Sequence, residues 1–131
     1  MTIHLVRAPA LTDEVPYAYA AVAAPGSLVF TAGACPLDGE GVIVSPGDVG
    51  AQAARVMENL VVALEASGCS LKDVAKSTVY VASSDRDDLV DAWHAVRAAF
   101  GDHDAPSTLL GVAALGYPDQ LVEVEAVAVR P

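Results

Sequence analysis

The chain has 131 residues, a formal net charge of −10 and a hydrophobic content of 53%. This length predicts a single domain spanning residues 1–131. Only seven lysines and arginines are present and they form no basic cluster, so nucleic acid and anionic membrane surfaces are not expected partners. The apolar excess is mostly alanine and valine, and it favours a homo-oligomer with small-residue interfaces.

The sequence also argues against export, membrane insertion and a metal site. No apolar run approaches the ~20 residues that span a bilayer, and the N-terminus lacks the pattern of a signal peptide. Cys35 and Cys69 are too few for a disulfide scaffold and lack metal-site spacing. No histidine pair has ligand spacing. We therefore expect a cytoplasmic protein with reduced thiols and no metal.

The first third of the chain predicts short strands. Residues 3–8 (IHLVRA) suit a first strand. The segments 17–24 (YAYAAVAA) and 27–36 (SLVFTAGACP) are extended and are joined by Pro25-Gly26, a strong turn signal. The pattern predicts a β-hairpin formed by these two segments.

Two helices and three more strands follow. Apolar residues recur at helical spacing after Asp48, a plausible N-cap, and the pattern ends at Gly68. Residues 73–83 alternate as a strand, and a second helix begins at Ser84 or Asp85 and closes at Gly101. The last two strands are predicted at residues 107–115 and 120–129.

This order predicts an α+β fold, with one mixed sheet and two helices on a single face. The other sheet face is then uncovered. The final strand, LVEVEAVAV, is too apolar to face water, so another subunit is expected to cover it.

Glu123 and Glu125 lie inside this apolar strand. The period of two places both on one face, ~7 Å apart, while the alternating valines and alanines suit packing against the helices. Two interpretations are open. A carboxylate in a half-buried oligomer cleft can act as an acid or a base. Alternatively, the pair forms an interface ion pair or a solvated strand face.

Other polar or aromatic residues also have two interpretations. Tyr17 could place its hydroxyl in a cleft or pack its aromatic ring against other side chains. Trp93 lies in the apolar stripe of the second helix, as core or as a pocket wall. Ser107 and Thr108 precede an apolar strand and need be no more than hydroxyls at the start of a strand. Cys35 has no obvious cationic neighbour, which favours a structural thiol over a nucleophile.

Four segments in this order carry a family resemblance. They are PYAYA, VFTAGACPLD, the long block AQAARVMENLVVALEASGCSLKDVAKSTVYV, and LVEVEAVAV. Together they span nearly the whole chain, which resembles the Rid or YjgF-like family, once labelled endoribonuclease L-PSP. The resemblance implies a chorismate-mutase-like fold and a homotrimer with a small-molecule ligand in each inter-subunit cleft. It also implies hydrolysis of enamines and imines such as 2-aminoacrylate, with no metal or organic cofactor.

The resemblance assigns half of the site directly. The family's cleft tyrosine corresponds to Tyr17, and its water-positioning glutamate corresponds to Glu123, the first acid of the VEVEA motif. The backbone of the family's TSG-like turn falls on residues 31–33, with Ala32 in place of the usual serine beside Gly33.

The other half departs from the family. The arginine that grips a substrate carboxylate corresponds to Ser107, within Ala105-Pro106-Ser107-Thr108. Trp93 stands where an asparagine often lines the cleft, and Leu109 where some members have a cysteine. A serine hydroxyl cannot replace a guanidinium fork. We therefore expect a less polar substrate than 2-aminoacrylate.

Two functions follow from this pattern. The first is an enzyme acting on a small imine, enamine or related carbonyl-derived metabolite. Glu123 and Tyr17 would be catalytic, while Ser107, Thr108, Trp93, Leu109 and the backbone of Ala32 and Gly33 would bind substrate. Hydrolysis, tautomerisation and condensation all fit these groups. The second is a non-catalytic, metabolite-binding or regulatory trimer. The acidic charge argues against a ribonuclease.

Overall fold

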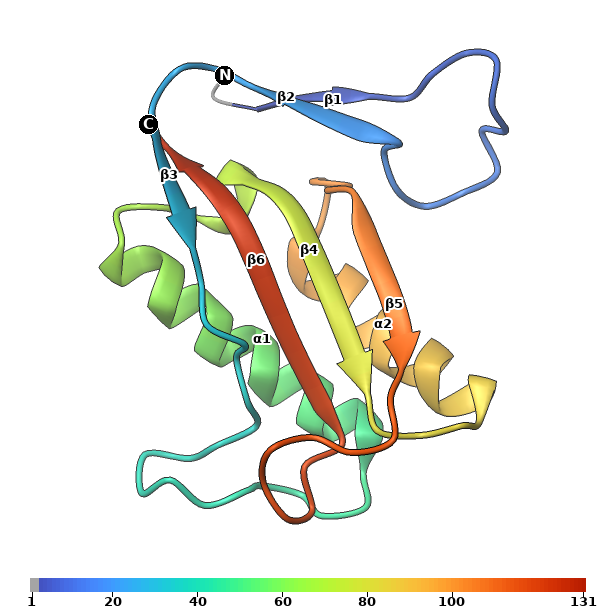
Figure 1. Cartoon of the computed structure of the whole chain (residues 1–131), viewed down its shortest axis with the longest axis vertical. Coiled ribbons are helices and arrows are strands. Elements are labelled where there is room, and N and C mark those ends of the chain that lie inside the picture. Colours follow the sequence, from blue (N-terminus) through green and yellow to red (C-terminus); the bar gives the residue numbers. More distant parts are fainter. Residues whose placement is uncertain (1–2) are drawn as a thin grey trace.

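A four-stranded sheet forms the centre of the computed structural model, which describes residues 3–131, and two helices lie behind one face of the sheet (Figure 1). The predicted element order and the α+β class are confirmed. The strands are β1 (Ile3–Val6), β2 (Ala20–Ala23), β3 (Ser27–Phe30), β4 (Val74–Val81), β5 (Ser107–Gly111) and β6 (Val122–Arg130). The helices are α1 (Val49–Ala66), the short 3-10 helix η1 (Leu71–Asp73) and α2 (Arg86–Phe100).

The central sheet has the strand order β3-β6-β4-β5 and is mixed. β6 pairs antiparallel with both of its neighbours, whereas β4 and β5 are parallel. The parallel pair needs a crossover connection, and α2 provides it by leading from the end of β4 back to the start of β5.

Both long helices begin and end where the sequence signals predict. Asp48 caps α1 by accepting a hydrogen bond from the Ala51 N–H at 3.0 Å. Asp85 caps α2 in the same way. Beyond the two C-termini, Gly68 and Gly101 have φ angles of +80° and +63°, which glycine adopts without strain.

The core lies between the sheet and the helices. Alternate residues of β4 and β6 point into it, so the predicted two-residue period is correct in both strands. Its least exposed large side chains include Met57, Leu60 and Leu64 from α1, Val79 and Val81 from β4, Val96 from α2, and Val122 and Val124 from β6.

The predicted hairpin between residues 17–24 and 27–36 is wrong. β2 pairs with β1 in a separate two-stranded sheet, and β3 pairs with β6. The turn signal at Pro25-Gly26 is real, but the chain uses it to pass from one sheet to the other. Gly26 permits the passage, because a Cβ there would lie 2.9 Å from the Arg130 carbonyl oxygen. Figure 1 shows the β1–β2 pair lying across one end of the central sheet.

Most of the predicted strands are also shorter than expected, as β3 and β5 illustrate. β3 ends at Phe30, although Ala34 makes a further isolated bridge to Val124 on β6. β5 ends at Gly111, where a side chain would meet the Ser83 carbonyl oxygen.

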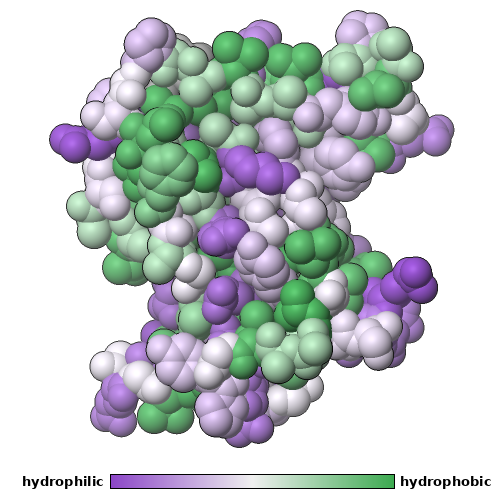
Figure 2. Space-filling model, viewed as in Figure 1, coloured by the Kyte–Doolittle hydropathy of each residue, from purple (hydrophilic) through white to green (hydrophobic). Residues whose placement is uncertain are grey.

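The face of the sheet away from the helices, here called the open face, is uncovered in the single chain. Figure 2 shows polar groups near its centre with hydrophobic groups beside them. Phe30 and Leu28 on β3 are 71% and 57% exposed. Within residues 3–131 no helix is long and apolar enough to cross a bilayer.

Candidate active site

Glu123 lies on the open face of β6, beside the segment that continues from β3. Ala34 and Val124 exchange backbone hydrogen bonds of 2.7 and 3.2 Å, which fixes this segment against β6. A Cβ at Gly33 would overlap the Glu123 carboxylate, so glycine is required for this close approach. The N–H groups of Ala32 and Gly33 form no hydrogen bond within residues 3–131 and are available as donors.

Two side chains hold one oxygen of the Glu123 carboxylate. Gln120 Nε2 donates to Oε1 at 3.1 Å, and the Cys35 thiol donates to the same oxygen at 3.3 Å. Gln120 is buried and is itself fixed by hydrogen bonds with the Tyr117 N–H and the Val122 carbonyl. Within residues 3–131, Oε2 accepts no hydrogen bond, so this oxygen is free to accept one from a water or a ligand.

The thiol of Cys35 stays protonated at neutral pH. Burial, followed by the hydrogen bond and the negative charge of Glu123, raises its pKa to about 11. A protonated thiol is a hydrogen-bond donor and a poor nucleophile. The geometry therefore agrees with a structural role for Cys35, and makes it a support for Glu123.

Glu125 has a different environment, although it shares the open face. The Tyr80 hydroxyl donates to Glu125 Oε1 at 2.5 Å, and this bond raises the pKa of Tyr80. Neither glutamate forms an ion pair within the described residues. The two carboxylates thus differ in what holds Oε1: a tyrosine hydroxyl of the neighbouring strand β4 for Glu125, and the side chains of Gln120 and Cys35 for Glu123.

A cavity of about 250 Å³ lies on the helix-facing side of the sheet. Tyr17 lies in the segment before β2, Trp93 on α2, and Ser107 and Leu109 on one face of β5. The cavity is lined by Pro16, Tyr17, Trp93, Ser107 and Leu109. Trp93 is half-buried and also packs against the core, so it has both of the roles that the sequence left open.

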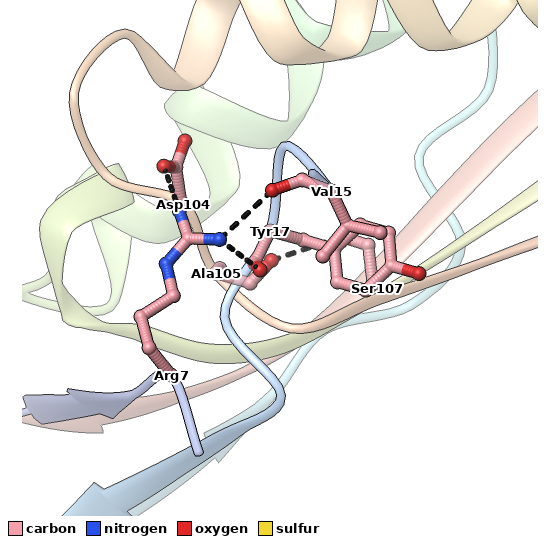
Figure 3. Close-up of polar contacts among 6 residues, drawn as sticks. All are labelled: Arg7, Val15, Tyr17, Asp104, Ala105 and Ser107. Carbon is pink, nitrogen blue, oxygen red and sulfur yellow. Dashed lines mark hydrogen bonds and ion pairs between the residues drawn. The ribbon is translucent and has the colours of Figure 1, made fainter. Parts of the chain in front are cut away.

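Ser107 and Thr108 do not lie together. The Ser107 hydroxyl is hydrogen-bonded to the Ser77 hydroxyl. It also donates to the Ala105 carbonyl oxygen at 3.4 Å (Figure 3). Thr108 points to the open face, where its hydroxyl accepts a hydrogen bond of 2.6 Å from Lys76 Nζ. The resemblance placed both hydroxyls in one site, and the single chain separates them.

The sheet also separates the cavity from Glu123. Ser107 is paired with Ser77, whose side chain points into the core, whereas Glu123 is paired with Tyr80 on the open face. Side chains on opposite faces of one sheet cannot converge on one small molecule. Within a single chain, the residues assigned by resemblance therefore form two half-sites.

Three supporting residues carried no usable signal in the sequence. The sequence predicts Gln120 at the start of the last strand and Cys35 at a strand end, and it shows Pro16 only as the residue before Tyr17. Their roles depend on contacts between distant segments, such as the 88-residue separation between Cys35 and Glu123. Among residues 3–131, no group of three or more His, Cys, Asp or Glu side chains could hold a metal ion.

Comparison with known families gives a match over almost the whole chain. Residues 8–130 match the family model described as endoribonuclease L-PSP. This chain belongs to the Rid family. Among curated Rid relatives, a RutC family protein of Pyrococcus abyssi is 35% identical over 105 residues, covering 80% of each chain. A protein of Salmonella typhimurium named 2-iminobutanoate/2-iminopropanoate deaminase is 36% identical over 107 residues, covering 80% of this chain and 81% of its own.

Solved structures of Rid proteins have the same fold. The Rid family protein YyfB of Yersinia pestis superposes with a TM-score of 0.92 at 26% identity, covering 98% of this chain and 99% of its own. RidA from an Antarctic Psychrobacter gives a TM-score of 0.70 at 29% identity, with 98% coverage of each chain. The family and the fold expected from the sequence are therefore confirmed.

Proposed function

We propose that this Rid protein acts on a small imine or enamine, or a related carbonyl-derived metabolite, in a cleft between two subunits of a homotrimer. The observation that carries the proposal is the Glu123 carboxylate, with Oε1 held by Gln120 and Cys35 and with Oε2 free. Relatives named 2-iminobutanoate/2-iminopropanoate deaminase support imine chemistry at the level of the family.

Hydrolysis illustrates how these groups would act. Glu123 Oε2 accepts a proton from a water molecule while the water oxygen bonds to the imine carbon. Glu123 passes this proton to the imine nitrogen, which gives a carbinolamine. It then takes the hydroxyl proton of the carbinolamine and delivers it to the nitrogen as the C–N bond breaks, so a carbonyl compound and ammonia or an amine are released. The Tyr17 hydroxyl and the free N–H groups of Ala32 and Gly33 are the donors proposed to polarise the imine. Tautomerisation or condensation would use the same carboxylate as a base. The scheme needs only side chains, backbone and water.

The proposed substrate differs from that of a standard 2-aminoacrylate deaminase. None of the five residues lining the cavity is a lysine or an arginine, and the Ser107 hydroxyl already has partners. Arg97 borders an adjoining cavity, but its volume of about 10 Å³ holds at most one water molecule. A carboxylate would therefore be desolvated without a cation to pair with. The cavity suits an uncharged apolar group enclosed by Tyr17, Trp93 and Leu109.

A direct test compares imines with and without a carboxylate. 2-Iminobutanoate is generated in situ by an amino-acid oxidase, and uncharged imines are generated by an amine oxidase. The wild type is expected to accelerate the hydrolysis of the uncharged imines. Glu123→Gln is expected to hydrolyse them ~100-fold or more slowly than the wild type, which is typical of a lost general base. Glu125→Gln is the matched control and should retain activity. Rates equal to the uncatalysed background for every imine would refute imine hydrolysis.

The inter-subunit cleft predicts complementation between two inactive variants. Because the half-sites lie on opposite faces of one chain, Glu123 of one copy must act with the cavity of another. Mixing Glu123→Gln with Trp93→Asp, refolded together at equal amounts, leaves about a quarter of the clefts with both native half-sites. Recovery of about a quarter of wild-type activity is expected. No recovery, in a mixture that light scattering shows to be trimeric, would contradict the shared cleft.

The alternative is a non-catalytic trimer that binds a metabolite or regulates a partner. Engagement of the Ser107 hydroxyl by Ser77 favours this alternative, because it leaves the cavity with few groups to orient a reacting molecule. Uncharged imine analogues that bind to the wild type and to Glu123→Gln with equal affinity, without any turnover, would support it.

A further inference from the structure

The guanidinium of Arg7 joins two segments that are far apart in sequence. Nη1 donates to the carbonyl oxygens of Val15 at 2.9 Å and Tyr17 at 2.5 Å. Nη2 forms an ion pair of 2.7 Å with Asp104 Oδ2. Figure 3 shows the guanidinium placed between the two carbonyl groups and the carboxylate.

These contacts connect the two sides of the apolar cavity. The carbonyls that Arg7 binds flank Pro16, and Pro16 with Tyr17 forms one wall. Asp104 lies three residues before Ser107 in the chain. Ser107 forms the opposite wall of the cavity together with Trp93. A second link runs directly between the two segments, because the Ala18 N–H donates to the Asp104 carbonyl at 2.9 Å.

We propose that Arg7 is a positioning residue which, with Asp104, sets the width of the cavity between Pro16-Tyr17 and Trp93. The proposal rests on the proposed function, in which this cavity takes the apolar group of the substrate. Arg7 does not line the cavity and therefore acts through the wall that it holds. It selects for flat, uncharged groups by keeping Tyr17 and Pro16 close to Trp93.

An arginine suits this role better than a lysine. The planar guanidinium donates in several fixed directions, and here it serves three acceptors at once. The side chains of Arg7 and Asp104 are 42% and 25% exposed, and such ion pairs contribute little to global stability. Loss of Arg7 should therefore change the cavity more than the fold.

Trp93 makes the proposal measurable without a substrate, because it is the only tryptophan in the chain. Acrylamide, an uncharged quencher, reports how open its surroundings are. Arg7→Ala and Asp104→Ala should each raise the Stern–Volmer constant of the protein about twofold. The double variant should exceed the larger single effect only slightly, since the two residues form one unit. Arg7→Lys keeps the charge and the apolar stem, and is expected to open the cavity part-way.

The matched control is Arg86→Ala, which removes an exposed arginine at the start of α2, and its quenching should equal that of the wild type. Quenching that is unchanged in both Arg7→Ala and Arg7→Lys would overturn the proposal. Equal effects of Arg86→Ala and Arg7→Ala would overturn it too, because the response would then follow the loss of a charge.

Kinetics separate this role from general destabilisation. With an uncharged imine that the wild type hydrolyses, Arg7→Ala should raise KM about tenfold and change kcat less than about twofold. A partly unfolded variant would instead lose kcat at constant KM, and that result would overturn the proposal. If the wild type hydrolyses no imine, the proposed function fails, whereas the quenching experiment still decides whether Arg7 sets the cavity width.

Discussion

Replacing Glu123 by glutamine should make the Cys35 thiol more reactive. The thiol donates a hydrogen bond to Glu123 Oε1, and its pKa is raised to about 11 by burial and then by this carboxylate. Glutamine has the same shape without the negative charge, so the burial remains and the effect of the carboxylate is removed. The pKa of Cys35 falls, and at a given pH more of it is thiolate, the nucleophilic form.

The raised pKa of Cys35 sets the size of the effect. At pH 8, a thiol with a pKa of about 11 is ~0.1% thiolate, against ~9% at the ordinary value of 9.0. Each unit by which the pKa falls gives tenfold more thiolate but lowers the intrinsic nucleophilicity ~threefold, so the net gain is about threefold per unit. Because burial is the largest cause and persists in the variant, we expect acceleration of about threefold, with a ceiling near tenfold.

The assay is alkylation by iodoacetamide at pH 8, followed by mass spectrometry of the peptide that contains Cys35. Reading the reaction by peptide excludes Cys69, which is buried and whose pKa is also raised by burial. Glu125→Gln is the matched control, since Glu125 contributes nothing to the pKa of Cys35. Equal alkylation rates in the wild type and Glu123→Gln would refute the contact between thiol and carboxylate, and with it the support that holds Oε1.

Three further outcomes are expected. Ser107→Arg should raise kcat/KM for 2-iminobutanoate about tenfold or more over the wild type, because it supplies a guanidinium for the substrate carboxylate. The measurement uses imine generated by an amino-acid oxidase, and no gain would mean that the cavity walls exclude the arginine side chain. Gly33→Ala should lower the free energy of unfolding by ~1–3 kcal/mol in urea titrations, because its Cβ displaces the Glu123 carboxylate, and unchanged stability would contradict that packing. Ser77→Ala should cost ~1 kcal/mol by the same measurement, since the Ser107 hydroxyl keeps only the Ala105 carbonyl as its partner; a loss above ~3 kcal/mol would point to a larger polar network.

The sequence predicts best what depends on neighbouring residues. Asp48 and Gly68 mark the ends of α1 because capping is local, and the face of Glu123 follows from alternation along a single strand. The partner of β2 could not be predicted in this way. The signal at Pro25-Gly26 predicts a turn, but it does not predict which strands pair. Here β2 pairs with β1, and β3 pairs with β6.

The separation of Ser107 from Thr108 was available in the sequence, since adjacent residues of a strand point to opposite faces. The resemblance groups them because they are neighbours in a motif, but the alternation that gives the face of Glu123 also assigns these two hydroxyls to opposite faces. The contacts of Arg7 had no such signal. Its partner Asp104 is 97 residues away, and neither residue belongs to a recognisable pattern.

The division into two half-sites bears on the proposed function, in which the substrate differs from that of a 2-aminoacrylate deaminase while Glu123 remains the proposed base. Gly33, Cys35 and Gln120 contact the Glu123 carboxylate, and within residues 3–131 none of them is hydrogen-bonded to Ser107 on β5. A substitution at position 107 therefore alters the binding half without disturbing the carboxylate. In the proposed trimer the halves would meet only in the assembled cleft, so the two proposed functions could vary independently in one chain.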